Sequence, residues 1–241
     1  MIIAVSDLHL GSEACNKDEF MRFLKDPMWA NDRELVLCGD IFDFWRRSIV
    51  DVLIENSDVI DGLQYMYDEL GVRITVIAGN HDWILRNVKH PCFKFSTFHQ
   101  VVEGSTKYTF IHGWETDPIQ KRELFDALCY TNNRGGEFLD RAWKAYMRFS
   151  GLWLYVPGWI RKTRTMIEMR KMLIPPEQRS LGFLFSPPLP VACEMEGDVT
   201  VCGHTHVPYI QNSVINCGCW CSATNTYAMI TGNIATVQEF K

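Results

Sequence analysis

The chain has 241 residues, of which 47% are hydrophobic and 22% are charged, and its formal net charge is −5. This composition supplies enough apolar material for a packed core and excludes general disorder. The negative charge disfavours a surface built to collect polyanions, and no apolar run reaches the roughly 20 residues that a membrane-spanning helix needs.

Nine cysteines are scattered along the chain. Their odd number, in a chain of this size, argues against a disulfide framework, and reduced thiols are the simpler interpretation. Residues 1–5 form an apolar, strand-like run without the basic start of a signal peptide, so we expect none. The expected location is the cytoplasm.

Short apolar runs that are rich in β-branched residues predict buried strands over 2–6, 34–38, 73–78 and 199–202. Apolar residues recur at helical spacing over 49–70, and Gly71 follows as a helix stop. Two hairpins are expected, over 98–112 and 226–240. This alternation of strands and helices predicts a layered α/β sandwich with some antiparallel pairing.

The segment from about 115 to 180 differs in character from the rest. Residues 141–172 hold eight Lys or Arg, one Glu and many aromatic side chains. We predict a single domain over 1–241 with a helical cap inserted at about 115–180. Basic helices with Trp suit a lipid interface or an anionic substrate, and the candidate contacts are Arg141, Arg148, Arg161 and Arg164. The alternative is a helical subdomain with inward-packed aromatics and solvated arginines.

Five short polar motifs each follow an apolar run. They are Ser-Asp-Leu-His at 6–9, Gly-Asp-Ile-Phe-Asp at 39–43, Gly-Asn-His-Asp at 79–82, His-Gly at 112–113 and Gly-His-Thr-His at 203–206. Each motif alone is weak, because Gly-Asp and Gly-Asn are ordinary turn dipeptides. Ligands of α/β sheets bind beyond the carboxyl ends of the strands, so the motifs are expected to converge there.

The converging side chains are oxygen and nitrogen donors without a thiolate. They are Asp7, His9, Asp40, Asn80, His112, His204 and His206. This mixture suits Mn, Fe, Zn, Ni or Co, rather than calcium or a thiolate zinc site. Seven donors are too many for one ordinary site. They suit two ions with a bridging carboxylate, the usual clamp for in-line displacement at phosphorus.

The motif set D-x-H, G-D-x-x-D, G-N-H-D, H and G-H-x-H resembles that of the calcineurin-like metallophosphoesterases, from Asp7 to His206. The resemblance implies an α-β-β-α sandwich and two divalent ions, with Mn²⁺ as the first expectation. It implies one ion on Asp7, His9, Asp40 and His206, and a second on Asp40, Asn80, His112 and His204.

The same resemblance implies hydrolysis of a phosphodiester or pyrophosphate bond by an activated water. His81 would lie above the two ions as a catalytic residue, and Asp43 or Asp82 would orient it. Its role stays open between proton donation to the leaving oxygen and stabilisation of phosphoryl charge.

Longer motifs point to one branch of this family. Residues 6–11, 39–45 and 216–220 resemble the UDP-2,3-diacylglucosamine pyrophosphatases, which implies a cap that encloses acyl chains at the inner membrane surface. Trp45 is a candidate substrate contact. That branch has Arg where this chain has His81, and Asp where it has Trp114. The substrate therefore stays open between a nucleotide-linked lipid and another phosphodiester, and the sequence leaves the oligomeric state open.

Two alternative functions remain at this level. A basic aromatic groove could hold single-stranded nucleic acid, and the exonuclease branch of the family shares the motifs G-D-x-F-D and G-N-H-D. The acidic charge of the rest of the chain, however, disfavours a long binding surface for nucleic acid. A non-catalytic scaffold would lack metal ligands, and here the set is complete.

The cysteines at 217, 219 and 221 alternate, so we expect them on one strand face. We interpret them as small buried hydrophobes rather than a metal clip.

Overall fold

A computed structural model gives the structure of the protein and describes residues 1–29, 33–116, 122–130 and 193–241. The chain divides into two compact units, Met1–Asn133 with Leu189–Lys241, and Arg134–Pro188. Most of the predicted cap, including its four candidate arginines, lies outside the described residues, so the cap stays a prediction.

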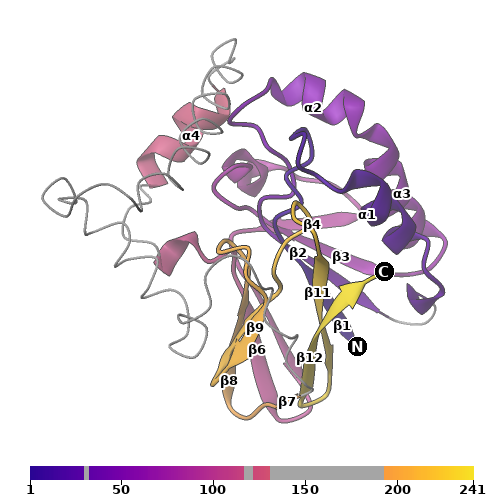
Figure 1. Cartoon of the computed structure of the whole chain (residues 1–241), viewed down its shortest axis with the longest axis vertical. Helices are drawn as coiled ribbons and strands as arrows, with labels where there is room; N and C mark the ends of the chain where they lie inside the picture. The colour runs from indigo at the N-terminus through magenta and orange to yellow at the C-terminus, as the bar shows by residue number, and fades with distance from the viewer. Residues whose placement is uncertain (30–32, 117–121, 131–192) are drawn as a thin grey trace, which may run out of the picture. The chain divides into compact units, whose positions relative to one another are not determined.

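The first sheet holds the predicted early strands and the C-terminal hairpin. Its strands are β1 (Ile2–Val5), β2 (Glu34–Cys38), β3 (Arg73–Ile77), β4 (Phe93–Ser96), β7 (Cys193–Glu194), β11 (Asn225–Thr231) and β12 (Ile234–Phe240). They lie in the order β4-β3-β2-β1-β11-β12-β7 (Figure 1). Strands β1 to β4 are parallel, and β11 pairs antiparallel with both β1 and β12.

A second sheet contains the other predicted hairpin. Its strands are β5 (His99–Glu103), β6 (Thr106–Phe110), β8 (Asp198–Cys202), β9 (Tyr209–Gln211) and β10 (Val214–Asn216), in the order β5-β6-β8-β10-β9. Strands β6, β8 and β10 are parallel. The parallel strands of both sheets therefore bring their carboxyl ends to the motifs that follow them.

The helices in the described part of the chain are α1 (Lys17–Leu24), α2 (Ile49–Glu55), α3 (Ser57–Asp68) and α4 (Arg122–Tyr130), with short 3-10 turns η1 (Pro27–Trp29), η2 (Trp83–Asn87) and η3 (Trp114–Thr116). The single helix expected over 49–70 is wrong in one respect, because it divides at Asn56. This buried side chain donates to the Val52 carbonyl at 2.7 Å, and such bonds compete with helical ones. The expected stop at Gly71 is confirmed by its φ of +66°.

Alternating side chains of the first sheet build the two apolar layers. Ile3 and Val5 pack with residues of α1 and α3, among them Phe20 and Leu63. Ile2 and Ala4 instead pack with the inner side chains of the second sheet. This period of two is what a strand buried on both faces requires, and it confirms the expected α/β sandwich. No described helix is long and apolar enough to cross a membrane.

A buried carboxylate of the first sheet contacts a histidine of the second sheet. The Glu34 carboxylate on β2 and His99 Nε2 on β5 lie 2.6 Å apart. Burial by itself would raise the pKa of Glu34, but the hydrogen bond and charge of His99, with Arg73 and Lys94 nearby, lower it. Because its pKa is lowered in the folded protein, the ionised Glu34 carboxylate contributes its full stability at pH values above its ordinary pKa of 4.5. This contribution is lost as the pH falls through the folded-state pKa.

We therefore expect Glu34→Gln to lower the free energy of unfolding by about 1 kcal/mol at neutral pH, because a charge-assisted hydrogen bond is lost. The gap from the unmodified protein should shrink as the pH falls below 4.5. Urea unfolding at a series of pH values measures this gap. Glu69→Gln, at an exposed carboxylate, is the control, and a gap that is independent of pH would contradict the assignment.

Candidate metal centre

The five motifs follow the ends of β1, β2, β3, β6 and β8, as the sequence predicted. Five of their residues have left-handed backbone, with φ between 52° and 67°: Asp7, His9, Asp40, His204 and His206. Non-glycine residues adopt this region rarely, and it persists only where surrounding contacts hold it. Backbone bonds supply such contacts, since His9 N–H donates to the Asp40 carbonyl at 2.9 Å and Gly203 N–H to the His112 carbonyl at 2.9 Å.

Asp7 has one anchored oxygen and one that faces the histidines. Its Oδ2 accepts bonds from the Ser6 hydroxyl at 2.6 Å and the His204 N–H at 2.7 Å. Its Oδ1 is buried, accepts no hydrogen bond within the described residues, and lies 3.1 Å from His206 Nε2. A buried carboxylate oxygen without a donor is costly unless a cation faces it.

Asp40 lies between two groups of histidines. Its Oδ1 accepts the His81 backbone N–H at 2.8 Å. Its Oδ2 lies 3.2 Å from His112 Nε2 and 3.8 Å from His9 Nε2. In this position, between His112 and His9, the oxygen could coordinate two metal ions at once.

The ring of His112 is held in the orientation that a metal ligand needs. Its Nδ1–H donates to the Cys38 carbonyl at 2.8 Å, which leaves Nε2 as the coordinating atom. That Nε2 lies 3.1 Å from the Asn80 side-chain oxygen. His9 and His206 form a similar pair, with their Nε2 atoms 3.3 Å apart. Two imidazole nitrogens at this distance share either a proton or a cation.

Electrostatics also favour cations at this place. Burial would raise the pKa of Asp7 and of Asp40, but the neighbouring histidines hold both well below the usual range. Burial lowers the pKa of His112, yet Asp40 and Asp7 outweigh it and raise this pKa to about 10. The carboxylates thus draw protons onto the imidazoles, and divalent ions would displace those protons on binding.

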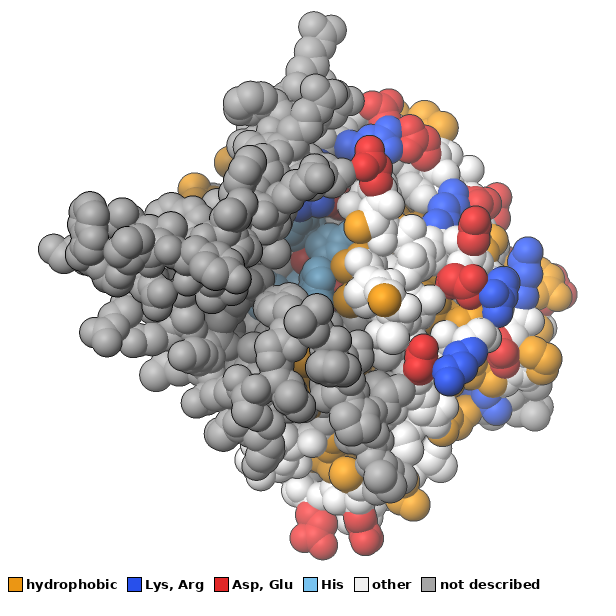
Figure 2. All heavy atoms as spheres, in the orientation of Figure 1, with side chains coloured by type: hydrophobic (Ala, Val, Ile, Leu, Met, Phe, Trp, Pro, Cys, Tyr) orange, Lys and Arg blue, Asp and Glu red, His pale blue; other side chains and the backbone are white. Residues whose placement is uncertain are grey.

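Donor atoms gather into groups compact enough for single ions. In each group they lie within 4.8 Å of one another, and the groups are His9, His206 and Cys221; His9, Asp40 and His81; and Asp40, His112 and His204. Asp40 and His9 each belong to two of them, and the groups also include His81 and Cys221, which are outside the seven expected ligands. Figure 2 shows histidine side chains gathered at one place on the surface, with an acidic side chain among them. The residues therefore fit a pair of divalent ions.

His81 lies at the edge of this cluster. Its ring is 4.8 Å from the His9 ring, and its Nδ1 lies 3.0 Å from Asp43 Oδ1. The other Asp43 oxygen lies 3.1 Å from Arg46. Burial lowers the pKa of His81, but Asp40 and Asp43 outweigh it and raise this pKa. Asp43 is thus the carboxylate that hydrogen-bonds the His81 ring.

The structure shows which groups Asp82 and Trp45 contact. The Asp82 carboxylate accepts backbone N–H bonds from Ile41, Phe42 and Gly79 at 2.7–3.2 Å, so it ties two loops together and is not placed to orient His81. Trp45 stacks on the His81 ring at 4.0 Å between centroids and 19° between planes. One face of its indole is therefore occupied by His81 rather than by substrate.

Asn216, at the end of β10, begins the sequence motif at 216–220, but the motif alone did not indicate its role. This buried amide donates to the Gly203 carbonyl at 2.7 Å and accepts the Gly218 N–H at 2.9 Å, so it supports the His204 loop. The cysteine prediction was partly wrong, because residues 217–221 form no strand. Cys217 and Cys219 are buried, as expected, whereas Cys221 is partly exposed and lies with His9 and His206 in one of the possible ligand groups.

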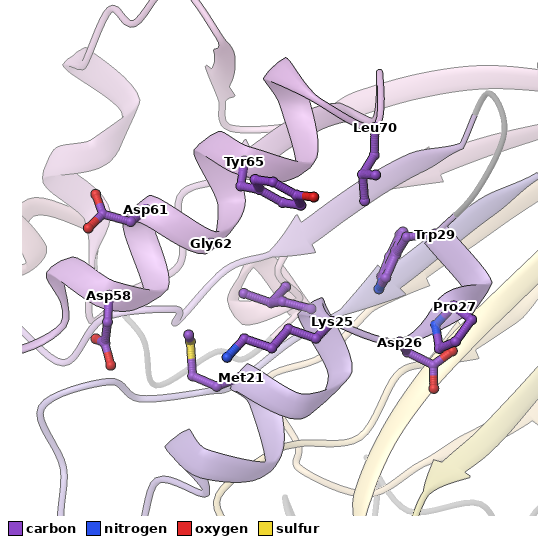
Figure 3. Close-up of a pocket in the computed structure, with 11 residues that line it drawn as sticks. Met21, Lys25, Asp26, Pro27, Trp29, Asp58, Asp61, Gly62, Tyr65 and Leu70 are labelled. Atoms are coloured by element: carbon purple, nitrogen blue, oxygen red, sulfur yellow. The ribbon is translucent and has the colours of Figure 1, made fainter.

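A separate pocket of about 660 Å³ opens between α1, η1 and α3 (Figure 3). Apolar side chains such as Met21, Trp29 and Tyr65 line it, with Asp58 and Asp61 at its edge. None of the candidate ligands borders it. The candidate metal centre is therefore identified by its donor atoms and lies outside this pocket.

The chain matches the model of the calcineurin-like phosphoesterase family over residues 1–208. A search of curated proteins finds no match. Similar solved structures include a Vps29 single mutant from Entamoeba histolytica (11% identity, TM-score 0.42, 100% of this chain and 99% of that chain). Another is an archaeal phosphodiesterase (14% identity, TM-score 0.41, 99% of this chain and 98% of that chain). A third is the phosphoesterase YfcE from E. coli (14% identity, TM-score 0.39, 100% of this chain and 99% of that chain). Likeness at these TM-scores does not bear on activity.

Gly79 offers a test of the packing around Asp40. A Cβ at this position would collide with the Asp40 carboxylate. We expect Gly79→Ala to lower the free energy of unfolding by about 1–3 kcal/mol through overpacking, and to reduce the amount of bound metal. Chemical unfolding and elemental analysis measure the two effects. Gly62→Ala on α3 is the matched control, and equal metal content in both variants would contradict this account.

Proposed function

Because the chain belongs to the calcineurin-like phosphoesterase family, we propose that it hydrolyses a phosphodiester or pyrophosphate bond at a pair of divalent ions. The observation that carries the proposal is the position of Asp40 Oδ2 between His112 and His9. The seven residues proposed to hold the ions are Asp7, His9, Asp40, Asn80, His112, His204 and His206. Mn²⁺ is the first metal to test, followed by Fe, Zn, Ni and Co.

Two such ions, when bound, lower the pKa of a water molecule and neutralise charge on the phosphoryl oxygens. The protein contributes a rigid donor set. Ser6 and the His204 N–H hold Asp7, the Cys38 carbonyl holds His112, and the His81 N–H holds Asp40. Prearranged donors lower the reorganisation that the reaction itself requires.

His81 is the proposed catalytic residue outside the ligand set. The Nδ1–H of the protonated ring donates to Asp43 Oδ1 at 3.0 Å, which fixes the orientation of the ring, and stacking on Trp45 limits its tilt. The raised pKa of His81 favours the protonated ring. Its Nε2–H is then available to donate to a phosphoryl oxygen or to the leaving oxygen.

The finer proposal for the substrate is a nucleotide-linked lipid cleaved at its pyrophosphate bond. It rests on the motifs at 6–11, 39–45 and 216–220 and on the basic, aromatic composition of 141–172. That composition suits acyl chains and an anionic headgroup, with peripheral contact at a membrane surface.

A hydrolysis panel on the manganese-loaded protein tests the function. It compares bis-p-nitrophenyl phosphate, p-nitrophenyl phosphate, a nucleotide diphospho-lipid and single-stranded DNA. We expect turnover of the diester and preference for the diphospho-lipid. Preference for DNA would favour a nuclease, activity on the small diester alone would remove the lipid proposal, and metal binding without hydrolysis of any compound would favour a scaffold.

In the same panel, Asp40→Ala should abolish hydrolysis and release at least one ion, because both ions lose a ligand. Elemental analysis gives the stoichiometry, and circular dichroism checks the fold. Asp40→Asn preserves the shape of the side chain, and Asp61→Ala, an exposed carboxylate on α3, is the control. Full activity of Asp40→Ala would refute the assignment.

For His81→Ala we expect both ions to remain and the rate to fall by about 10²–10⁴-fold, the usual contribution of a general acid or base. Diesters with leaving groups of graded pKa separate the two proposed roles. A loss that grows with leaving-group pKa indicates proton donation, whereas a constant loss indicates stabilisation of the phosphoryl oxygens. Loss of metal would instead mean that His81 is a ligand.

A further inference from the structure

Two thiols lie against His206 on the side away from Asp7. Cys221 Sγ is 3.5 Å from His206 Nδ1, while His206 Nε2 faces Asp7 Oδ1 at 3.1 Å. Cys219 Sγ is 3.8 Å from the His206 carbonyl oxygen. Histidines that bind metal through one ring nitrogen usually donate the other N–H to a fixed acceptor. The Cys221 sulfur has the position of that acceptor.

The backbone around these thiols is fixed. Trp220 stands between them, is fully buried, and donates its indole N–H to the Thr226 carbonyl at 2.8 Å. Its backbone N–H donates to the Asp7 carbonyl at 3.1 Å, and its carbonyl accepts the Asn16 N–H at 2.9 Å. The thiols are therefore held in place beside the candidate ligands, and a chemical change at either sulfur acts directly on His206.

The two thiols are two residues apart in the chain, and each contacts His206. They interact with each other through their side chains, and the chain bends from Trp220 onward, which shortens the distance between residues two apart. Cys221 is partly exposed, whereas Cys219 is 2% exposed. One sulfur can thus meet an oxidant from solvent, and the other is placed to resolve the product.

We propose that Cys219 and Cys221 are an oxidation site at which a hydroperoxide forms a reversible disulfide that weakens metal binding through His206. This inference rests on the proposed metal centre. In the first step the Cys221 sulfur attacks the peroxide, an S–O bond forms, the O–O bond breaks, and an alcohol or water leaves. In the second step the Cys219 sulfur attacks the sulfenic sulfur, the S–S bond forms, and water leaves. The two thiols lose two electrons and two protons, and the peroxide is reduced.

The disulfide acts on the metal centre by removing a contact. The Cys221 sulfur can no longer keep its present position against Nδ1 once it is bonded to Cys219. The His206 side chain is half-exposed, and its other ring nitrogen faces Asp7 and His9, so Cys221 is the neighbour that fixes Nδ1. Loss of such a partner typically lowers metal affinity by about 10–100-fold, and reduction by a dithiol restores the contact.

The test uses the full-length, manganese-loaded protein and hydrogen peroxide at low molar excess. Peptide mass mapping locates any disulfide, and titration with Mn²⁺ gives the metal affinity before oxidation, after it, and after reduction with dithiothreitol. We expect a disulfide between Cys219 and Cys221, at least tenfold weaker binding of one ion, and recovery on reduction. Neither Cys219→Ser nor Cys221→Ser should show this reversible change.

Cys92→Ser is the matched control, because Cys92 is a partly exposed thiol that contacts Gln64 rather than the centre. It should respond to peroxide as the unmodified protein does. A disulfide to Cys15, no disulfide, or a disulfide with unchanged metal affinity would each overturn the inference. Both readouts are independent of catalysis. A protein that binds metal and shows the reversible change, but hydrolyses nothing, would support this inference while refuting the proposed hydrolysis.

Discussion

The Asp40 carboxylate is the contact on which the rest of the centre depends. One of its oxygens accepts the His81 backbone N–H, and the other faces His112 and His9. It therefore joins loops that follow three different strands, at a place where burial makes an unpaired charge costly. The negative charge concentrated by Asp40 and Asp7 accounts for the raised pKa of His112, and it is what makes the cluster a site for cations.

Placing these groups requires a strained backbone and very close packing. Five non-glycine residues of the motifs have positive φ, and Gly79 and Gly203 lie so near Asp40 and Asp7 that neither position has room for a Cβ. Strain of this kind is commonly found at functional sites, where surrounding structure enforces it. Here the enforcing contacts are backbone bonds between neighbouring loops, together with Asp82, Asn216 and Trp220. The sandwich is thus a rigid support for a small polar cluster.

Much of the architecture was predictable because it follows from local patterns. The strand at 34–38 was predicted with its observed bounds, and the two hairpins differ from the structure by one or two residues, since runs of β-branched residues and Gly turns are local signals. The division at Asn56 was not predictable, because it depends on a buried amide that helical periodicity does not reveal. Helix α1 was missed although Phe20, Phe23 and Leu24 have helical spacing.

The sequence by itself determined the family and the donor set, because motifs after successive parallel strands must meet at one edge of a sheet. Only the tertiary structure decided which neighbours those donors have. It separated Asp43 from Asp82 by their hydrogen-bond partners, placed Trp45 on His81, and brought two thiols against His206. These contacts join residues far apart in the chain, and their geometry depends on how the two sheets pack. The spacing of residues along the sequence does not predict such distances.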